Sequence, residues 1–139
     1  MGYQQILMLV LCVIIVGTSV TVGLDMFENA MVDSNRNAVI SDMNIFAGVA
    51  FAYYKTPNGM GGGAHTWDVD ELGMWFGFNY DAMNNTILNQ NGIYHFSSYG
   101  EMLTIIGTGT SEGNDGSENV KATLLFNGET GEIVTSINN

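Results

Sequence analysis

The chain has 139 residues, a length typical of one folded domain with an extension. It carries 14 acidic and 3 basic residues, and its net charge of −11 argues against binding to nucleic acid or anionic lipid headgroups, because both are negatively charged. The single cysteine, Cys12, excludes a disulfide within the chain.

The first predicted element is an uncharged apolar segment at positions 6–24 of the opening region 1–24. As a helix, about 20 residues at about 1.5 Å each would cross a hydrocarbon core of about 30 Å. A cleavable secretion signal is disfavoured, since no Lys or Arg precedes the segment and no small-residue cleavage site follows it. A simple membrane anchor fits the length but lacks basic flanks, because Asp25 and Glu28 follow. The third interpretation is a membrane-compatible helix that finally packs against copies of itself.

Small residues in the second half of this segment favour helix–helix contact. The pairs Gly17–Thr21 and Ser19–Gly23 have the four-residue spacing that lets helix backbones approach closely. Burying one large aliphatic side chain is worth about 1.5–3 kcal/mol, so leaving the whole row in water is very unfavourable. Cys12 is interpreted as a small hydrophobic residue of this row. The expected assembly core comprises Ile6, Leu7, Leu9, Val10, Val13, Ile14, Val16, Gly17, Val20, Gly23 and Leu24.

Residues 25–57 continue the same helix as an amphipathic segment. Lys55 suits a helix C-terminus and Pro57 ends the pattern, which predicts one helix over about residues 2–54. Gly17 and Gly23 leave two expectations open, an unbroken helix or local unwinding between them. The predicted buried stripe consists of Val39, Met43, Phe46, Ala47, Ala50, Phe51 and Tyr54.

Residues 58–92 are predicted to be a glycine-rich loop followed by an irregular region. Asn58-Gly59 and the three glycines at 61–63 mark the loop. The glycines lack the Lys-Ser/Thr ending of a phosphate-binding loop. Within the irregular part, "MWFGF" at 74–78 is expected to be a short strand or a core segment.

Residues 93–139 are predicted to form a small antiparallel sheet. Segments 93–98, 102–110, 120–126 and 132–137 are rich in β-branched and aromatic residues and are bounded by turns. The turn at 127–131 predicts a hairpin of the last two strands. The expected fold class is therefore α+β, a long N-terminal helix carrying a sheet-based head.

No catalytic, metal or cofactor site is expected, so the chain is not expected to be an enzyme. His65 and His95 have no partners at zinc-site spacing, and no nucleophile–histidine–acid arrangement is recognisable. The acidic groups at 68–71 and 112–118 lack the spacing of a calcium loop and are interpreted as solvated. Asn84 begins an Asn-Asn-Thr acceptor for N-glycosylation, which matters only in a host that performs it.

Three stretches carry a resemblance to a known family: "YQQILMLVLCVIIVG", "NRNAVISDMN" and "YYKTPNGMGGG". Together with the helix-then-sheet order, they resemble type IV pilins, in particular a group of largely uncharacterised bacterial pilin-like proteins. The resemblance implies a precursor in the inner membrane whose basic leader is removed by a prepilin peptidase. An ATPase-driven assembly machinery then stacks the subunits into an extracellular filament, a helical homopolymer with the helices inside.

The resemblance favours a major pilin, and two alternatives stay open. One is a minor pilin or a type II secretion pseudopilin, and the other, of a different class, is a monomeric membrane-anchored binding domain. The chain departs from the family pattern at Gln5, where many pilins have glutamate. If Met1 is the mature start, Gln4 and Gln5 are the expected polar contacts of its amine. The helix-breaking proline found early in many bacterial pilins is also missing from this sequence.

Overall fold

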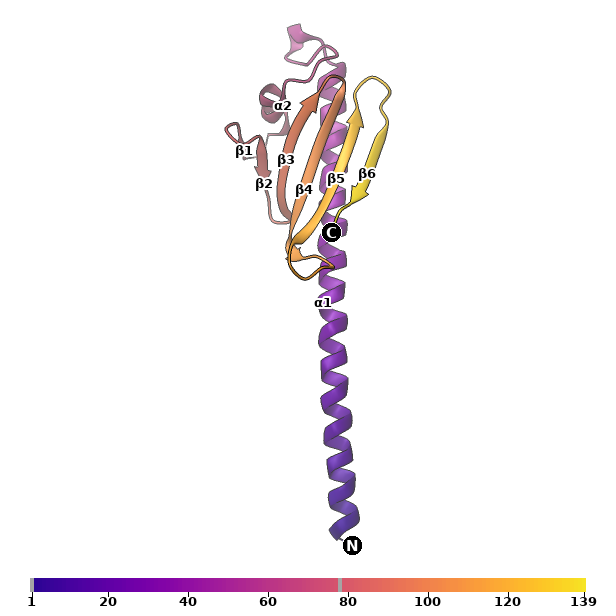
Figure 1. Ribbon diagram of the computed structural model, residues 1–139. Helices are drawn as coiled ribbons and strands as arrows, with labels where there is room; N and C mark the ends of the chain where they lie inside the picture. Colours follow the sequence, from indigo (N-terminus) through magenta and orange to yellow (C-terminus); the bar gives the residue numbers. More distant parts are fainter. Residues whose placement is uncertain (1, 78) are drawn as a thin grey trace.

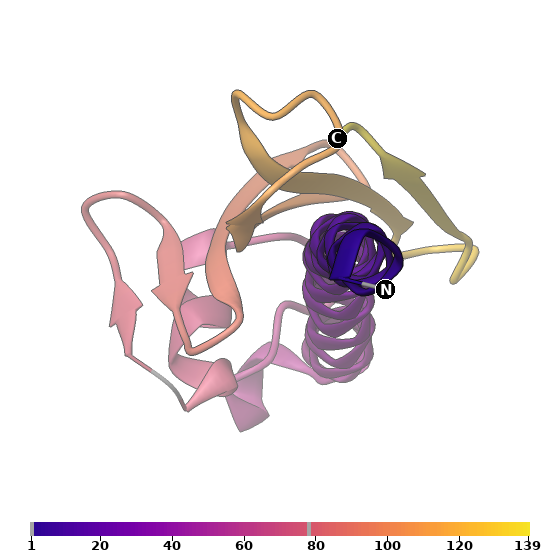
Figure 2. The same cartoon turned by 90° about the horizontal axis from the view of Figure 1, so that it is seen from below.

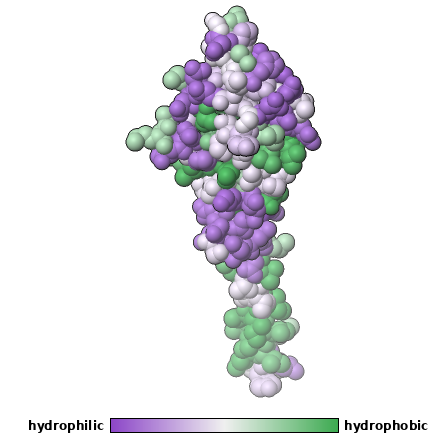
Figure 3. All heavy atoms as spheres, turned by 45° about the horizontal axis from the view of Figure 1, so that its top comes forward, coloured by the Kyte–Doolittle hydropathy of each residue, from purple (hydrophilic) through white to green (hydrophobic). Residues whose placement is uncertain are grey.

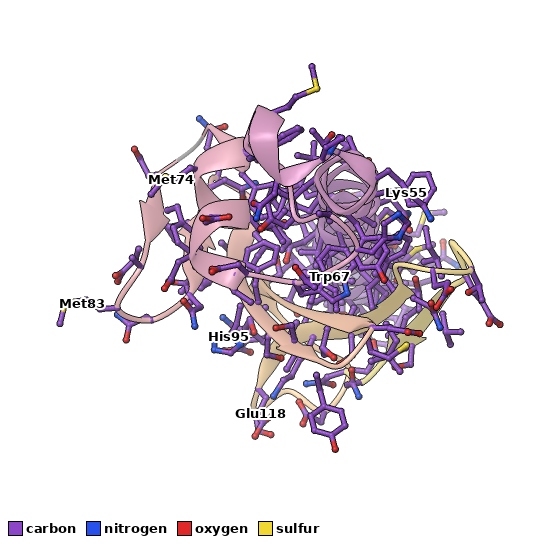
Figure 4. The ribbon with its side chains drawn as sticks, turned by 90° about the horizontal axis from the view of Figure 1, so that it is seen from above. Lys55, Trp67, Met74, Met83, His95 and Glu118 are labelled. Carbon is purple, nitrogen blue, oxygen red and sulfur yellow. The ribbon has the colours of Figure 1, made fainter. Side chains whose placement is uncertain are left out.

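The computed structural model describes residues 2–77 and 79–139. One helix, α1 (Gly2–Lys55), runs the whole length of the molecule, and everything after it folds against its C-terminal half as a head (Figure 1). Lys55 lies at the end of α1, where its ammonium group sits 5.5 Å from the ring centroids of Phe51 and Tyr54 (Figure 4). The predicted helix and the α+β fold class are confirmed.

The helix is unbroken between Gly17 and Gly23, so the expected alternative of local unwinding is wrong for this structure. The hydroxyl groups in this stretch bond to carbonyl oxygens of the preceding turn. Thr18 Oγ1 donates to Ile14 O at 3.1 Å, and Ser19 Oγ donates to Ile15 O at 2.7 Å. These bonds satisfy the polar side chains within the helix itself, which makes them compatible with an apolar surrounding.

The head is built on a six-stranded antiparallel sheet in which each strand pairs with the next one in the sequence. The turn between the last two strands forms the predicted hairpin, with Leu125 opposite Val134. The four longer strands match the predicted segments to within two residues at either end. The strands are β1 (Tyr80–Asp81), β2 (Thr86–Leu88), β3 (Gly92–Tyr99), β4 (Met102–Glu112), β5 (Asn119–Asn127) and β6 (Ile133–Ile137).

The region 58–92 is more regular than expected. It contains a 3-10 turn, η1 (Asn58–Met60), a helix, α2 (Val69–Phe76), and strands β1 and β2. Asp68 starts α2, because its carboxylate accepts from the backbone N–H groups of Asp70 and Glu71. Of the two expectations for 74–78, the short strand is wrong, because residues 74–76 end α2 and Gly77 closes it at φ 65°. Phe76 of this segment does belong to the core, and residue 78 lies outside the described residues.

The core lies between the C-terminal half of α1 and the concave inner face of the sheet, with α2 beside it (Figure 2). The predicted stripe of α1 is buried except for Phe51, which is 40% exposed, and Tyr53 joins it as a buried residue that the prediction lacked. The helix approaches β4 so closely that a Cβ on Gly107 would lie 2.6 Å from Val39 Cγ1. Glycine at this position therefore sets the spacing between helix and sheet.

Two polar side chains of α1 fasten the sheet to the helix. Asn35 Oδ1 accepts from the backbone N–H groups of Thr110 and Ser111 at the irregular end of β4. Asp42 Oδ2 accepts from Asn89 Nδ2 at 2.9 Å, from Asn91 Nδ2 at 2.8 Å and from the Tyr94 hydroxyl at 2.7 Å. The turn before β3 is thereby tied to one helix carboxylate.

Candidate functional site

The N-terminal part of α1 is an apolar surface with nothing packed on it. Every residue from 2 to 31 is exposed, whereas the same helix is buried against the sheet further along. Ile6 is 64% exposed, Val13 63% and Leu24 59%, so these large apolar side chains are uncovered in the single chain. In the space-filling view this part stands out as hydrophobic below a hydrophilic band (Figure 3). We call residues 2–24 the apolar half of α1.

All eleven residues predicted for the assembly core lie in the apolar half, on a single rigid helix. At about 100° per residue they span about 200° of the helix surface, and other apolar residues such as Leu11 and Ile15 lie on the rest, so any one neighbour can cover only part of this surface. At Gly17 and Gly23 an added Cβ would meet nothing within 4 Å, so both positions are free for a neighbouring backbone to approach. Such a helix is suited to several neighbours at once.

By length and composition, α1 is the one helix in the described chain that is apolar and long enough to cross a membrane. This property is compatible with a membrane anchor. It does not distinguish an anchor from an assembly segment, because both need an uncharged helix of this length.

Gln4 and Gln5 lie on the first turns of α1 and are exposed. Their predicted partner, the amine of Met1, lies outside the described residues, so these contacts stay a prediction. Cys12 is also exposed, in the middle of the apolar half.

A charged band separates the apolar half from the head (Figure 3). It contains Asp25, Glu28, Asp33 and Arg36, and Arg36 Nη1 donates to Asp33 Oδ1 at 2.7 Å. Most of the charge is acidic, as it is over the whole chain. Along α1, the band begins at Asp25, where the uncharged stretch ends.

The residues that could carry chemistry are held apart. His65 lies in a turn with its ring 5.2 Å from that of Tyr54, and His95 points outward from β3 (Figure 4). Over residues 2–77 and 79–139, no three His, Cys, Asp or Glu side chains gather at a metal-binding distance. Asn84 is exposed in the turn between β1 and β2, where its Nδ2 donates to Asp81 Oδ2 at 2.6 Å.

Two of the acidic residues interpreted from the sequence as solvated have structural roles. Asp68 caps α2, as described above. Asp115 accepts from the backbone N–H groups of Ser117 and Glu118, which holds the pKa of its carboxyl well below the usual range. These backbone bonds shape the loop between β4 and β5.

An aromatic cluster fastens the glycine-rich loop to the end of α1. The rings of Tyr54 and Trp67 lie 4.7 Å apart, and Trp67 Nε1 donates to the carbonyl of Glu101 at 2.8 Å. Burial, with the nearby carboxylate of Glu71, raises the pKa of Tyr53 to about 12. The aromatic cluster packs the top of the head, and the Tyr53 phenol stays protonated at all physiological pH values.

Sequence reasoning missed the functional part played by the polar residues of α1. Asn35 and Asp42 are seven residues apart and therefore lie on nearly the same face of the helix, beside the buried Val39. Polar residues at core-facing positions of an amphipathic helix are the signal that points to such fastening. Comparison with family models, curated proteins and solved structures found no match to this chain.

Proposed function

We propose that this chain is the major structural subunit of an extracellular filament of the type IV pilus kind. The observation that carries the proposal is the apolar half of α1, fully exposed in one copy of the chain. Each large side chain left in water costs about 1.5–3 kcal/mol relative to burial, so this helix needs either lipid or other protein around it.

The position of the head supports a filament. It covers only the C-terminal half of α1 and leaves the apolar half projecting far beyond it (Figure 1). Helices of several copies can then bundle on an axis while their heads form an outer wall. The acidic residues of the head would face water, and the charged band would lie at the boundary between the two zones.

The same helix serves the precursor state in this proposal. Before assembly the apolar half sits in the inner membrane, for which its length is sufficient. Processing by a prepilin peptidase and stacking by an inner-membrane assembly machinery follow from the pilin resemblance. The chain then has a structural role and is not an enzyme.

A minor pilin or pseudopilin would share this architecture, and a monomeric anchored binding domain would share the apolar helix. Gly17 and Gly23 favour assembly over a lone anchor, because their open surfaces suit close helix packing. The length and composition of the filaments distinguish a major pilin from a minor pilin or pseudopilin.

Electron microscopy of material sheared from producing cells, with identification of its main protein, tests the proposal. Long filaments made mainly of this chain are expected. Filaments that hold it only in trace amounts would favour the minor subunit. A chain recovered solely as a detergent-soluble monomer would contradict the proposal.

A further inference from the structure

The last strand of the sheet extends beyond the helix that covers its neighbours. Ile133 pairs with Phe126 and Ile137 with Ala122, and both of those β5 partners are buried on the inner face of the sheet. Ile133 and Ile137 therefore point to the inner side as well, yet they are 46% and 56% exposed. Both side chains lie on the inner face of the sheet, but no part of the described chain covers them.

Simple dimensions explain this overhang. A helix with its side chains is about 10 Å wide and covers about two strands, which lie about 4.8 Å apart. In this head α1 packs on β4 and β5, and α2 packs beside β3 (Figure 2). The layer of helices therefore ends before β6, and one more helix would complete it.

A groove of about 220 Å³ occupies this place, between α1 and β6. Its sides are formed by Phe51 and Ile133, and Phe126 lies between them. On the helix side, an added Cβ at Gly48 would meet nothing within 4 Å. The lining contains no charged residue and consists of Asn44, Ala47, Gly48, Phe51, Phe126, Gly131 and Ile133.

We propose that this groove, which we call the β6 groove, receives the apolar half of α1 from a second copy of the chain. The occupant needs to be apolar and uncharged, and residues 6–24 of the same sequence have this character and are uncovered. The segment cannot reach the groove of its own head, because α1 is one unbroken helix that carries it away (Figure 1). The partner is therefore another copy.

The dimensions and chemistry of the two surfaces agree. The five residues of β6 span about 17 Å at about 3.3 Å each, and 19 helical residues span about 28 Å, so the helix covers the strand fully. Neither the groove lining nor residues 6–24 carry a charge, although the chain has a net charge of −11. An uncharged contact leaves no carboxylate desolvated between the two copies. This inference rests on the proposed filament and names the surface of the head that joins it.

The pleat of β6 supplies a matched pair of variants. Ile133 faces the groove, whereas Val134, the next residue, faces the outer side of the sheet and is 52% exposed. Ile133→Asp places a carboxylate in the contact and is expected to reduce filament yield at least tenfold. Val134→Asp adds the same charge at similar exposure and is expected to leave the yield unchanged. Circular dichroism of both full-length variants checks that the head is folded.

Gly48 allows a second approach from the helix side of the groove. Gly48→Leu fills the groove and improves helix propensity, so it is expected to block assembly without unfolding the head. Gly48→Ala adds one methyl group in open space and is expected to assemble normally.

Cross-linking through the natural Cys12 tests whether the apolar half of a second copy occupies the β6 groove. In an Ile133→Cys variant, a flexible bismaleimide is expected to link two copies, and the link is expected to disappear when Cys12→Ser is added. Val134→Cys is the control and is expected to give at least fivefold less linked dimer. The reaction is run on sheared filaments and on the full-length chain concentrated in detergent, for long enough in the filaments that the covered, slowly reacting thiol of Cys12 is consumed.

Each outcome decides between the proposals. Equal yields from the two aspartate variants, or a linked dimer that does not depend on Cys12, would overturn the assignment of the β6 groove and leave the filament standing. Absence of filaments from the unmodified chain would contradict the proposed function. In that case the cross-link measured in detergent tests the assignment of the β6 groove alone. Equal amounts of linked dimer from Ile133→Cys and Val134→Cys in detergent would overturn it.

Discussion

Asp42 is the residue on which the attachment of the β2–β3 turn to α1 depends. Its partial burial raises the pKa of the carboxyl, but the hydrogen bonds from Asn91, Tyr94 and Asn89 outweigh burial and leave the pKa below the ordinary value of 3.8. The negative charge also acts on its partner: burial and the bond to Asp42 raise the pKa of the Tyr94 phenol. The pair is therefore built for an ionised aspartate and a neutral tyrosine.

We expect Asp42→Asn to destabilise the head by about 1–3 kcal/mol at neutral pH, because all three bonds end on Oδ2 and a neutral amide oxygen in its place accepts them more weakly than the charged carboxylate. Urea unfolding of the full-length chain in mild detergent, followed by the fluorescence of Trp67 and Trp75, measures the change. Asp25→Asn, at an exposed position of the charged band, is the control and is expected to have no effect. Equal stability of the two variants would contradict this role.

The lowered pKa of Asp42 predicts a pH dependence. An aspartate whose folded pKa lies below its unfolded value of about 3.9 stabilises the fold above that pH, and the contribution is lost as the pH falls through the folded pKa. The difference in unfolding free energy between wild type and Asp42→Asn is expected to be constant at pH 6–8 and to shrink below about pH 4. A difference that grows on acidification would contradict the assignment.

A glycine of β4 and a glycine of α1 are expected to respond in opposite ways to an added methyl group. Gly107→Ala would place its Cβ against Val39 and Met43, and we expect a loss of about 1–3 kcal/mol from overpacking. Gly48→Ala lies on the helix in open space and is expected to gain about 0.5–1 kcal/mol. The same unfolding assay compares them, and a loss at both positions would show that helix and sheet are spaced differently.

At the scale of elements, the long periodic patterns were predictable and the short elements were not. Helix α1 was predicted because its uncharged segment and its buried stripe extend over many turns. Helix α2 has only eight residues between glycine-rich flanks, too few for a periodic pattern. Asp68 followed by Glu71 has the spacing of an N-cap signal and could have located its start.

Within α1, Gly17 is expected to matter for packing and not for helix formation. Gly17→Leu improves helix propensity and lengthens the apolar row, so membrane insertion is expected to be retained. Filament yield is expected to fall several-fold, because the new side chain prevents close approach of a neighbouring backbone. Quantifying the chain in sheared and membrane fractions tests this, with Gly17→Ala as the mild control. An unchanged yield for Gly17→Leu would show that this face has no close neighbour.

At the scale of the whole molecule, two surfaces are proposed to take part in assembly, the apolar half of α1 and the β6 groove, and only the first could be predicted from the sequence. The apolar half was identifiable because missing charge over 19 residues is visible in the sequence itself. The β6 groove was not, since the uncovered side of Ile133 depends on how many strands one helix covers. That property arises only from the order of strands in the folded sheet.

The whole account depends on the claim that copies of this chain cover the apolar half of α1, and Cys12 reports on it directly. Cys12 is exposed in the single chain and lies in the middle of that surface. The most direct measurement is the rate at which a water-soluble maleimide labels Cys12 in isolated, detergent-free filaments, compared with the same chain in denaturant. The account predicts labelling at least a hundredfold slower in the filament. Labelling at the same rate in both states would show that the apolar half is not covered, and would contradict the account.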